Sequence, residues 1–299
     1  MAHQAVARLS VKDYKSDLKP VWCPGCGDFG VVASIYQALA KLNLDPDWTV
    51  LVSGIGCSSR IPGYVNTYSF NTIHGRALPI ATGVKMANPE LTVVVAGGDG
   101  DGFAIGTGHF VHAARRNVDL TYVLMDNEIY GLTKGQVSPT TPTDEVTKTS
   151  SYGNVERPMN PVLMALSCGA TFIARAFSGD PKTSQELIVQ AISHPGFSFV
   201  HMISPCPTFR GRQQFDIVRD RLRTLPAGFD CTDRDQARAI AFQDFEKDIT
   251  VGLIFKEERP TLDQAHEGLR RKAMAHGPFS YDDLLRSFIP ESCAVAAGR

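Results

Sequence analysis

The feature that most constrains the fold of this chain is a regular alternation of short apolar runs with helix-like stretches. The apolar runs are rich in β-branched residues and have turn residues nearby, as strands buried on both faces do. We predict strands at Trp48–Ser53, Leu91–Ala96, Leu120–Met125, Ala170–Ala174 and Phe197–Ile203. We predict helices at about Gly30–Leu42, Arg76–Met86, Phe103–Arg115, Asn160–Cys168 and Ser184–Ser193. Such alternation needs crossover connections, so the expected fold class is α/β, with a doubly wound, mostly parallel sheet.

The same alternation sets the expected domain boundaries. It starts near residue 20 and stops near residue 215, which predicts one α/β domain over residues 20–215 and an N-terminal arm over residues 1–19. Past Phe215 the chain carries more charges and Pro, with one short apolar run, ITVGLIF. We expect residues 216–299 to form an irregular C-terminal extension that packs on a partner subunit. A small helical cap or partial disorder is the alternative.

The composition indicates which binding partners and which cellular compartment to expect for this protein. Lys and Arg number 30 and Asp and Glu number 31, so the balance of charge does not favour binding to nucleic acid or to a membrane surface. No segment approaches the roughly 20 apolar residues of a membrane-spanning helix. The N-terminal stretch lacks the apolar core of a secretory signal. We therefore expect a cytoplasmic protein.

The strongest local signal is the glycine-rich segment 97–102, GGDGDG, which follows a predicted strand and precedes a predicted helix. Glycines let the backbone approach a ligand closely, and the N–H groups of a following helix attract an anion such as a phosphate. Asp99 suits a phosphate-binding loop only if a divalent cation such as Mg²⁺ lies between them. Asn127, after the next strand, would supply a second oxygen ligand. The alternative is that the segment is only a tight turn.

The cysteines form a second signal. Cys23 and Cys26 make a C-x-x-C motif, while Cys57 and Cys206 each follow a predicted strand. In a parallel sheet these strand ends lie at the edge that also carries the glycine-rich segment. Converging thiolates suit a [4Fe–4S] cluster or a structural zinc ion, and one pair with two distant single cysteines favours the cluster. Thioredoxin-like redox chemistry is a weaker interpretation.

The two signals together resemble a known family. A GDG segment followed about one crossover unit later by Asn resembles the thiamine diphosphate fingerprint. With the cysteines, residues 18–215 resemble the β subunit of 2-oxoacid:ferredoxin oxidoreductases. The resemblance implies that Mg²⁺ is bound by Asp99, Asn127 and the main-chain carbonyl of Ile129. It implies that one [4Fe–4S] cluster is bound by Cys23, Cys26, Cys57 and Cys206. The usual fingerprint ends in Asn-Asn, so Asp126 departs from it.

The resemblance also implies contacts around thiamine diphosphate. The expected cofactor-binding residues, besides the Mg²⁺ ligands, are Ser58, Arg60, His74, Gly98, Gly100, Asp101, Gly131 and Leu132. The resemblance places His74 near the diphosphate, and His74, Thr133 and Lys134 are the expected catalytic residues. Lys134 matches a position that carries Lys in relatives acting on dicarboxylic 2-oxoacids, where a cation would pair with the distal carboxylate. The alternatives are an ordinary helix-start loop around His74 and solvated charges at Arg60 and Lys134.

The activity implied by the resemblance is oxidative decarboxylation of a 2-oxoacid to an acyl-CoA and CO₂, or the reverse reaction. Electrons would pass singly through the cluster to ferredoxin. Lys134 favours 2-oxoglutarate, with pyruvate or a branched-chain 2-oxoacid as alternatives. The implied partner is an α subunit that supplies a glutamate to the aminopyrimidine ring, in a dimer of αβ units. Two other interpretations are a non-redox thiamine diphosphate enzyme and a zinc-stabilised assembly subunit.

Overall fold

The structure is a computed structural model that describes residues 7–243, 248–275, 277 and 280–289. Residues 1–6 of the expected N-terminal arm lie outside this range, as do 244–247, 276, 278–279 and 290–299 of the expected extension. The chain divides into a compact unit that ends at Leu262 and a C-terminal unit that begins at Asp263. The C-terminal unit contains most of α10 (Leu262–Met274) and all of α11 (Tyr281–Ser287).

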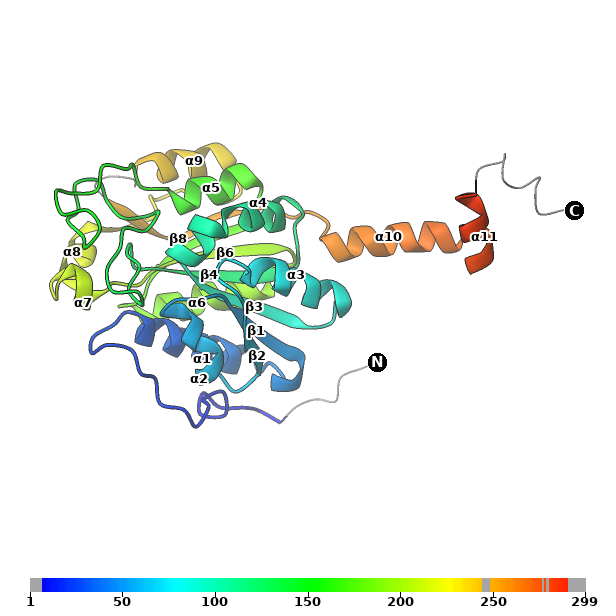
Figure 1. The fold of residues 1–299 in the computed structure, drawn as a ribbon, viewed down its shortest axis with the longest axis horizontal. Coiled ribbons are helices and arrows are strands. Elements are labelled where there is room, and N and C mark those ends of the chain that lie inside the picture. Colours follow the sequence, from blue (N-terminus) through cyan, green and yellow to red (C-terminus); the bar gives the residue numbers. More distant parts are fainter. Residues whose placement is uncertain (1–6, 244–247, 276, 278–279, 290–299) are drawn as a thin grey trace, which may run out of the picture. The chain divides into compact units, whose positions relative to one another are not determined.

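An eight-stranded sheet forms the centre of the first unit, with the strand order β2-β1-β3-β4-β6-β5-β8-β7 (Figure 1). Its strands are β1 (Thr49–Ser53), β2 (Tyr68–Asn71), β3 (Thr92–Gly98), β4 (Leu120–Asp126), β5 (Phe172–Phe177), β6 (Phe197–Ile203), β7 (Leu222–Thr224) and β8 (Ile249–Lys256). The strands from β2 to β5 in this order are parallel, and β8 is antiparallel to β5. The predicted α/β class and mostly parallel sheet are therefore confirmed.

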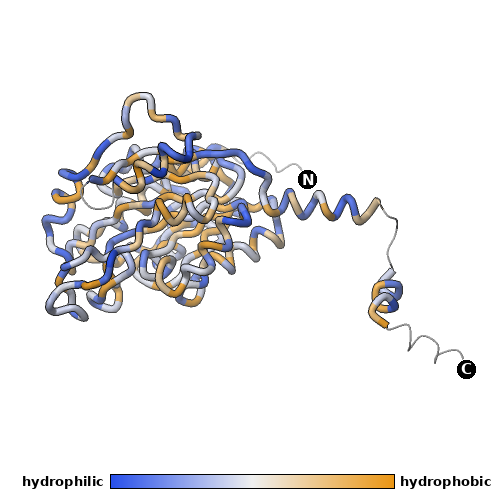
Figure 2. The backbone as a smooth tube through the Cα atoms, turned by 90° about the horizontal axis from the view of Figure 1, so that it is seen from above, coloured by the Kyte–Doolittle hydropathy of each residue, from blue (hydrophilic) through white to orange (hydrophobic). Residues whose placement is uncertain are grey.

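Helices cover both faces of this sheet and bury two apolar cores against it (Figure 1). One face carries α1 (Asp28–Leu42) and α6 (Pro181–Ser193). The other carries α3 (Ala77–Ala87), α4 (Thr107–Arg115), α5 (Pro161–Cys168) and α9 (Arg234–Gln243). Shorter helical elements are η1 (Pro46–Trp48), η2 (Ser58–Arg60), α2 (Ile61–Tyr64), α7 (Pro207–Arg210) and α8 (Gln214–Arg221). The strands carry much of the apolar sequence in the interior (Figure 2).

Three elements differ from the sequence-based expectations. β2 is an exposed edge strand without an apolar run, so the apolar pattern did not indicate it. The run ITVGLIF becomes β8 and joins the central sheet, so the compact unit extends past the boundary expected near Phe215. A π-helical turn, η3 (Asp101–Ile105), precedes α4 where one continuous helix was predicted from Phe103. Such turns are frequent at functional sites.

The strand order places a topological switch between β1 and β3. From β1 the chain runs first to β2 on one side of it and then to β3 on the other. In open parallel sheets ligands bind at the carboxyl ends of the strands beside such a switch. The glycine-rich segment after β3 and the Cys57 loop after β1 both lie at this position. In the described residues, no helix is both long and apolar enough to cross a membrane.

Candidate cofactor site

A cavity of about 250 Å³ lies at the carboxyl ends of β1, β3 and β4. Most of the residues that the sequence suggested for cofactor binding line it: Ser58, His74, Gly98, Asp99, Gly100, Asp101, Asn127, Ile129, Gly131, Leu132 and Thr133. The strand topology thus brings together residues from loops that follow several different strands and are far apart in the sequence.

Two of the suggested residues lie outside this cavity. Arg60 lines a neighbouring cavity of about 390 Å³, which shares Gly56 and Leu132 with the first. Lys134 is exposed and adopts a left-handed conformation with φ 79°. Its N–H donates to the Gly131 carbonyl at 3.0 Å, which closes a turn at the end of the loop after β4. The lining of the cavity does not include Lys134.

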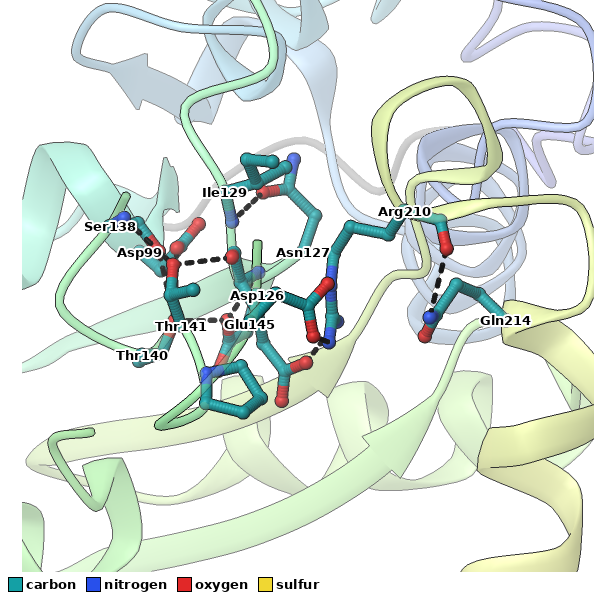
Figure 3. A network of polar contacts seen from close by, with 12 residues as sticks. Asp99, Asp126, Asn127, Ile129, Ser138, Thr140, Thr141, Glu145, Arg210 and Gln214 are labelled. Carbon is teal, nitrogen blue, oxygen red and sulfur yellow. Dashed lines mark hydrogen bonds and ion pairs between the residues drawn. The ribbon is translucent and has the colours of Figure 1, made fainter. Parts of the chain in front are cut away.

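The expected Mg²⁺ ligands face the same cavity. Asp99 is 2% exposed, and burial followed by the nearby charge of Asp126 raises the pKa of Asp99 to about 8. The Asn127 side-chain oxygen accepts the Ile129 N–H at 3.1 Å, which shapes the loop whose carbonyl was expected to bind the ion (Figure 3). Mg²⁺ prefers such oxygen ligands, and a divalent cation would favour the ionised form of Asp99. The donor set therefore fits the ion.

Two other features of the cavity bear on whether a diphosphate group fits: a buried hydroxyl without a partner, and close contacts around the glycine-rich segment. The buried Ser58 hydroxyl has no hydrogen-bond partner in the described part of the chain. A Cβ added to Gly98 would lie 3.3 Å from that hydroxyl oxygen. A Cβ on Gly100 would lie 2.4 Å from the Tyr130 ring, so only glycine fits there. The Ser58 hydroxyl at the cavity wall is therefore a donor that a diphosphate oxygen would accept from.

Asp101 organises the part of the cavity wall that includes Ile55 and His74. One of its oxygens accepts the Ile55 N–H at 2.9 Å and the Gly75 N–H at 2.7 Å, and lies 2.9 Å from His74 Nδ1. Asp101 therefore joins the loop after β1 to the loop before α3. A Cβ on Gly54 would lie 2.0 Å from the Asp101 carboxylate, which explains the glycine there. The contact holds His74 at the cavity.

The loops that carry the four predicted cluster cysteines are tied together. Trp22 Nε1 donates to the Cys57 carbonyl at 2.8 Å, and the Gly27 N–H donates to the Pro205 carbonyl at 3.0 Å. A Cβ on Gly131 would lie 3.3 Å from the Cys57 sulfur and 3.9 Å from the Cys206 sulfur. These contacts place the cysteine loops beside the loop that follows β4. The topology therefore brings the thiol groups to the edge that carries the cavity.

Burial controls the protonation of these thiols. Burial, followed by the charge of Asp28, raises the pKa of Cys57 to about 12, and burial raises the pKa of Cys206. The Cys23 charge contributes to both shifts, and the pKa of Cys26 is raised by burial, Asp28, Cys206 and Cys57. Buried thiols of this kind stay protonated unless metal coordination stabilises the thiolates. In the described residues, no three His, Cys, Asp or Glu side chains form a group suited to a single metal ion.

The sequence did not point to several polar residues that the structure places at the site. Asp28 lines the cavity, accepts the Ser204 hydroxyl at 2.7 Å, and has its pKa raised to about 6 by burial. The Thr140 hydroxyl lies 2.9 Å from Asp99 and 2.8 Å from Asp126 (Figure 3). Asp126, which departs from the usual fingerprint, is 3% exposed. The only sequence feature that could have indicated Asp28 is its position two residues after Cys26.

Arg210 joins the cysteine edge to the loop after β4. It ends α7, which begins directly after Cys206, and its guanidinium pairs with Glu128. It also pairs with Glu145 (Figure 3). The Arg210–Glu145 contact is bidentate, at 3.0 and 3.1 Å. The charges of Glu128 and Glu145 outweigh burial and raise the pKa of Arg210, so the group stays charged. Glu128 immediately precedes Ile129 and has φ 59°, so this ion pair holds an unusual backbone turn.

Known protein families match this chain over most of its length. Residues 54–202 match the thiamine pyrophosphate enzyme C-terminal TPP binding domain, and residues 206–271 match the C-terminal family of the pyruvate ferredoxin oxidoreductase beta chain. Subunit beta of 2-oxoacid:ferredoxin oxidoreductase 2 from Aeropyrum pernix is 51% identical over 197 residues, 66% of this chain and 64% of that protein. Subunit beta of oxidoreductase 1 from the same organism is 40% identical over 277 residues, 89% of this chain and 86% of that protein.

A solved structure is similar over nearly the whole fold. It is a 2-oxoglutarate:ferredoxin oxidoreductase from Magnetococcus marinus with 2-oxoglutarate, coenzyme A and succinyl-CoA bound. It is 45% identical in sequence, with a TM-score of 0.91, and the match covers 96% of this chain and 98% of that chain. The resemblance inferred from the glycine-rich segment and the cysteines is thereby confirmed. The chain belongs to the 2-oxoacid:ferredoxin oxidoreductase β-subunit family.

Proposed function

We propose that this chain is the thiamine diphosphate-binding β subunit of a 2-oxoacid:ferredoxin oxidoreductase, with 2-oxoglutarate as the favoured substrate. The products would be an acyl-CoA and CO₂, with electrons passed to ferredoxin, and the reverse carboxylation would use the same site. The observation that carries the proposal is the single edge of the sheet where the cavity, Asp99 and the Cys57 loop meet. The relatives named above support this reaction class.

Two sets of residues in the chain would bind two different cofactors. Thiamine diphosphate, when bound, supplies a carbon nucleophile for the 2-oxo group and stabilises the charge left by loss of CO₂. Asp99, Asn127 and the Ile129 carbonyl would hold Mg²⁺ against its diphosphate. His74, fixed by Asp101, would lie near the reacting groups with Thr133. Cys23, Cys26, Cys57 and Cys206 would hold one [4Fe–4S] cluster, which accepts electrons singly.

A partner subunit is part of this proposal. No glutamate is among the described residues that line the cavity, and Glu128 is paired with Arg210. The glutamate that the family resemblance implies for the aminopyrimidine ring would therefore come from an α subunit. Large apolar side chains are exposed at and beside the cavity: Ile55, Ile73 and Leu132 are 42%, 77% and 43% exposed. Such exposure is typical of a surface that a partner chain covers. A dimer of αβ units in the cytoplasm would complete the proposed enzyme.

Reduction of a one-electron dye tests the reaction and its substrate. The purified complex should reduce the dye with 2-oxoglutarate and coenzyme A, and removal of thiamine diphosphate should abolish the reduction. Lys134→Ala should lower kcat/KM for 2-oxoglutarate about tenfold more than for pyruvate, because a charge-assisted pair with the distal carboxylate is lost. Lys148→Ala is the control, since Lys148 is an exposed cation nearby that lies over the Phe209 ring. Equal losses on both acids would contradict the role of Lys134.

A further inference from the structure

A row of polar side chains crosses the sheet and ends at Asp99. It begins at the Thr250 carbonyl in β8, which accepts Arg175 Nη1 at 3.2 Å, and Arg175 in β5 lies 3.2 Å from His201 Nδ1 in β6. His201 Nε2 lies 2.8 Å from Asp126 Oδ2 in β4. Thr140, 2.8 Å from Asp126 Oδ1, then reaches Asp99 after β3 at 2.9 Å. The strands β8, β5, β6, β4 and β3 are successive neighbours in the sheet.

The chemistry of the groups fixes the direction of these hydrogen bonds. An arginine side chain only donates, so His201 Nδ1 must accept from Arg175 Nε. The proton of neutral His201 is therefore on Nε2, which donates to the Asp126 carboxylate. The register supports this arrangement, because Arg175 and His201 are direct partners in the β5–β6 pairing. Arg175, His201 and Asp126 are 4%, 5% and 3% exposed, so bulk solvent is largely kept from these contacts, which line a cavity of about 310 Å³.

Thr140 is the link between this row and the metal-binding carboxylate. Its hydroxyl contacts both Asp99 and Asp126 but carries a single proton. The Glu128 N–H also donates to Asp126 Oδ1, at 3.1 Å. Asp126 is thus contacted by the His201 ring, the Thr140 hydroxyl and the Glu128 N–H, which come from different segments. These contacts hold the Asp126 carboxylate in place, and the carboxylate in turn positions Thr140. Thr140 in turn contacts Asp99 Oδ2, the Ser138 side chain also hydrogen-bonds this carboxylate, and Asp99 lines the cavity.

We propose that Thr140 and His201 are positioning residues that orient Asp99 for Mg²⁺, so that the affinity for the metal depends on contacts reaching from β8. The inference rests on the proposed function, since Asp99 is a metal ligand only there. Asp99 lines the cofactor cavity, whereas Thr140, Asp126, His201 and Arg175 are not among its described lining residues, so the row would act through the carboxylate of Asp99. Loss of the row should weaken metal binding while leaving the affinity for the 2-oxoacid nearly unchanged.

Binding of Mn²⁺ in place of Mg²⁺ tests the proposal directly. The full-length chain, purified with its partner subunit and saturated with thiamine diphosphate, is titrated with Mn²⁺ while free Mn²⁺ is followed by electron paramagnetic resonance. Thr140→Val should weaken binding about tenfold, because a hydrogen bond to a charged group is lost. Thr140→Ser should restore the affinity of the unmodified protein. Thr143→Val is the control, since that hydroxyl donates to the Glu156 carbonyl in the same segment and does not contact the row.

Variants of His201 test whether the row extends beyond Thr140. His201→Phe removes both ring nitrogens and keeps a ring that stacks on Phe199, and it should also weaken Mn²⁺ binding several-fold. His201→Gln keeps one acceptor and one donor and should bind Mn²⁺ more tightly than His201→Phe. Circular dichroism confirms that each variant is folded; if His201→Phe is not, the Thr140 pair and His201→Gln decide the result.

The outcomes separate this inference from the proposed function. If the unmodified complex binds neither thiamine diphosphate nor Mn²⁺, the proposed function fails and the inference fails with it. If the unmodified complex binds both, but Thr140→Val matches it in Mn²⁺ affinity, the inference alone is overturned. If His201→Phe is folded and binds Mn²⁺ as tightly as the unmodified complex does, the claim that contacts between Asp126 and β8 influence metal binding is overturned. An increase in KM for 2-oxoglutarate equal to the loss of Mn²⁺ affinity would contradict a role through Asp99.

Discussion

Gly131 lies directly against Cys57: a Cβ added to Gly131 would be 3.3 Å from the Cys57 sulfur, closer than ordinary van der Waals contact. Gly131 belongs to the loop after β4 that also carries Asn127 and Ile129. The proposed metal-binding loop and the first single cysteine are therefore in contact through a residue without a side chain. Close approach of a cofactor and a cluster would follow from this contact.

Gly131→Ala should disturb the cysteine edge without unfolding the protein. The φ of Gly131 lies outside the left-handed region, so alanine is compatible with its backbone, and the disturbance would come from the added methyl group against the Cys57 sulfur. We expect a changed visible absorption spectrum and a lower iron content, with stability within about 1 kcal/mol of the unmodified protein. Gly83→Ala is the control, since a Cβ there meets no atom within 4 Å. An unchanged spectrum and iron content would show that the contact is unimportant.

Arg210→Met should destabilise the protein. The Arg210 side chain is 8% exposed and pairs with both Glu128 and Glu145, so its loss removes the ion-pair partner of two partly buried carboxylates, of which Glu128 keeps the charge of Arg221 nearby. We expect the free energy of unfolding to fall by about 3 kcal/mol, as measured by urea denaturation. Adding Glu128→Gln and Glu145→Gln should recover part of this loss, because neutral amides need no counter-charge. A triple variant less stable than Arg210→Met would argue against unpaired charge as the cause.

Asp101→Ala should weaken both stability and cofactor binding. Removal of the carboxylate leaves the Ile55 and Gly75 N–H groups without their acceptor, at a cost of about 3 kcal/mol in the free energy of unfolding. The same change frees His74 from its 2.9 Å contact, so the affinity for thiamine diphosphate should also fall. Asp101→Asn retains one acceptor oxygen and should lie between the two. Calorimetric titration with thiamine diphosphate would detect the opposite result, an affinity that Asp101→Ala leaves intact.

Acid should destabilise the protein through His194. The Thr171 hydroxyl donates its proton to the Asn117 side-chain oxygen, so at the 2.9 Å contact with His194 it must accept, and His194 Nε2 is the donor. The other ring nitrogen, His194 Nδ1, is buried without a hydrogen-bond partner in the described residues. Burial, followed by the charge of Lys256, lowers the pKa of His194 below its ordinary 6.5. Protonation therefore favours the unfolded chain, and the contribution of His194 to stability is present above pH 6.5 and is lost as the pH falls below it.

Replacement of His194 tests this linkage. His194→Gln keeps a donor for Thr171 but does not titrate, so its free energy of unfolding should fall less between about pH 7.5 and about pH 5.5 than that of the unmodified protein. Urea denaturation at several pH values measures both slopes. Exposed His266→Gln is the control and should retain the slope of the unmodified protein. Identical slopes for all three proteins would exclude His194 as the source.

The sequence predicted the parts of the fold that depend on local patterns. The strands β1, β3, β4, β5 and β6 are apolar runs, and the glycine-rich segment indicates a turn at the end of β3. The exposed strand β2 has no such pattern, and the place of β8 in the sheet depends on its pairing with β5. Local sequence carries little information about exposed edge strands or about which strands pair.

The same distinction applies to the site. Asp99, Asn127 and the cysteines were suggested because they follow strands or glycines in recognisable motifs. Thr140 and His201 have no motif, since their roles depend on which strands are neighbours and on the register between them. The orientation of Lys134 also depends on a left-handed turn that the sequence does not specify, and its role remains a prediction.

The most direct test of the central claim is the visible absorption of the purified complex under anaerobic conditions. We predict a broad iron–sulfur absorption that dithionite bleaches. We also predict that 2-oxoglutarate with coenzyme A bleaches the same band only when thiamine diphosphate and Mg²⁺ are present, because both cofactors would lie at one edge of the sheet. A colourless protein that holds zinc, or an iron–sulfur band that the 2-oxoacid leaves unchanged in the presence of thiamine diphosphate, would contradict this claim.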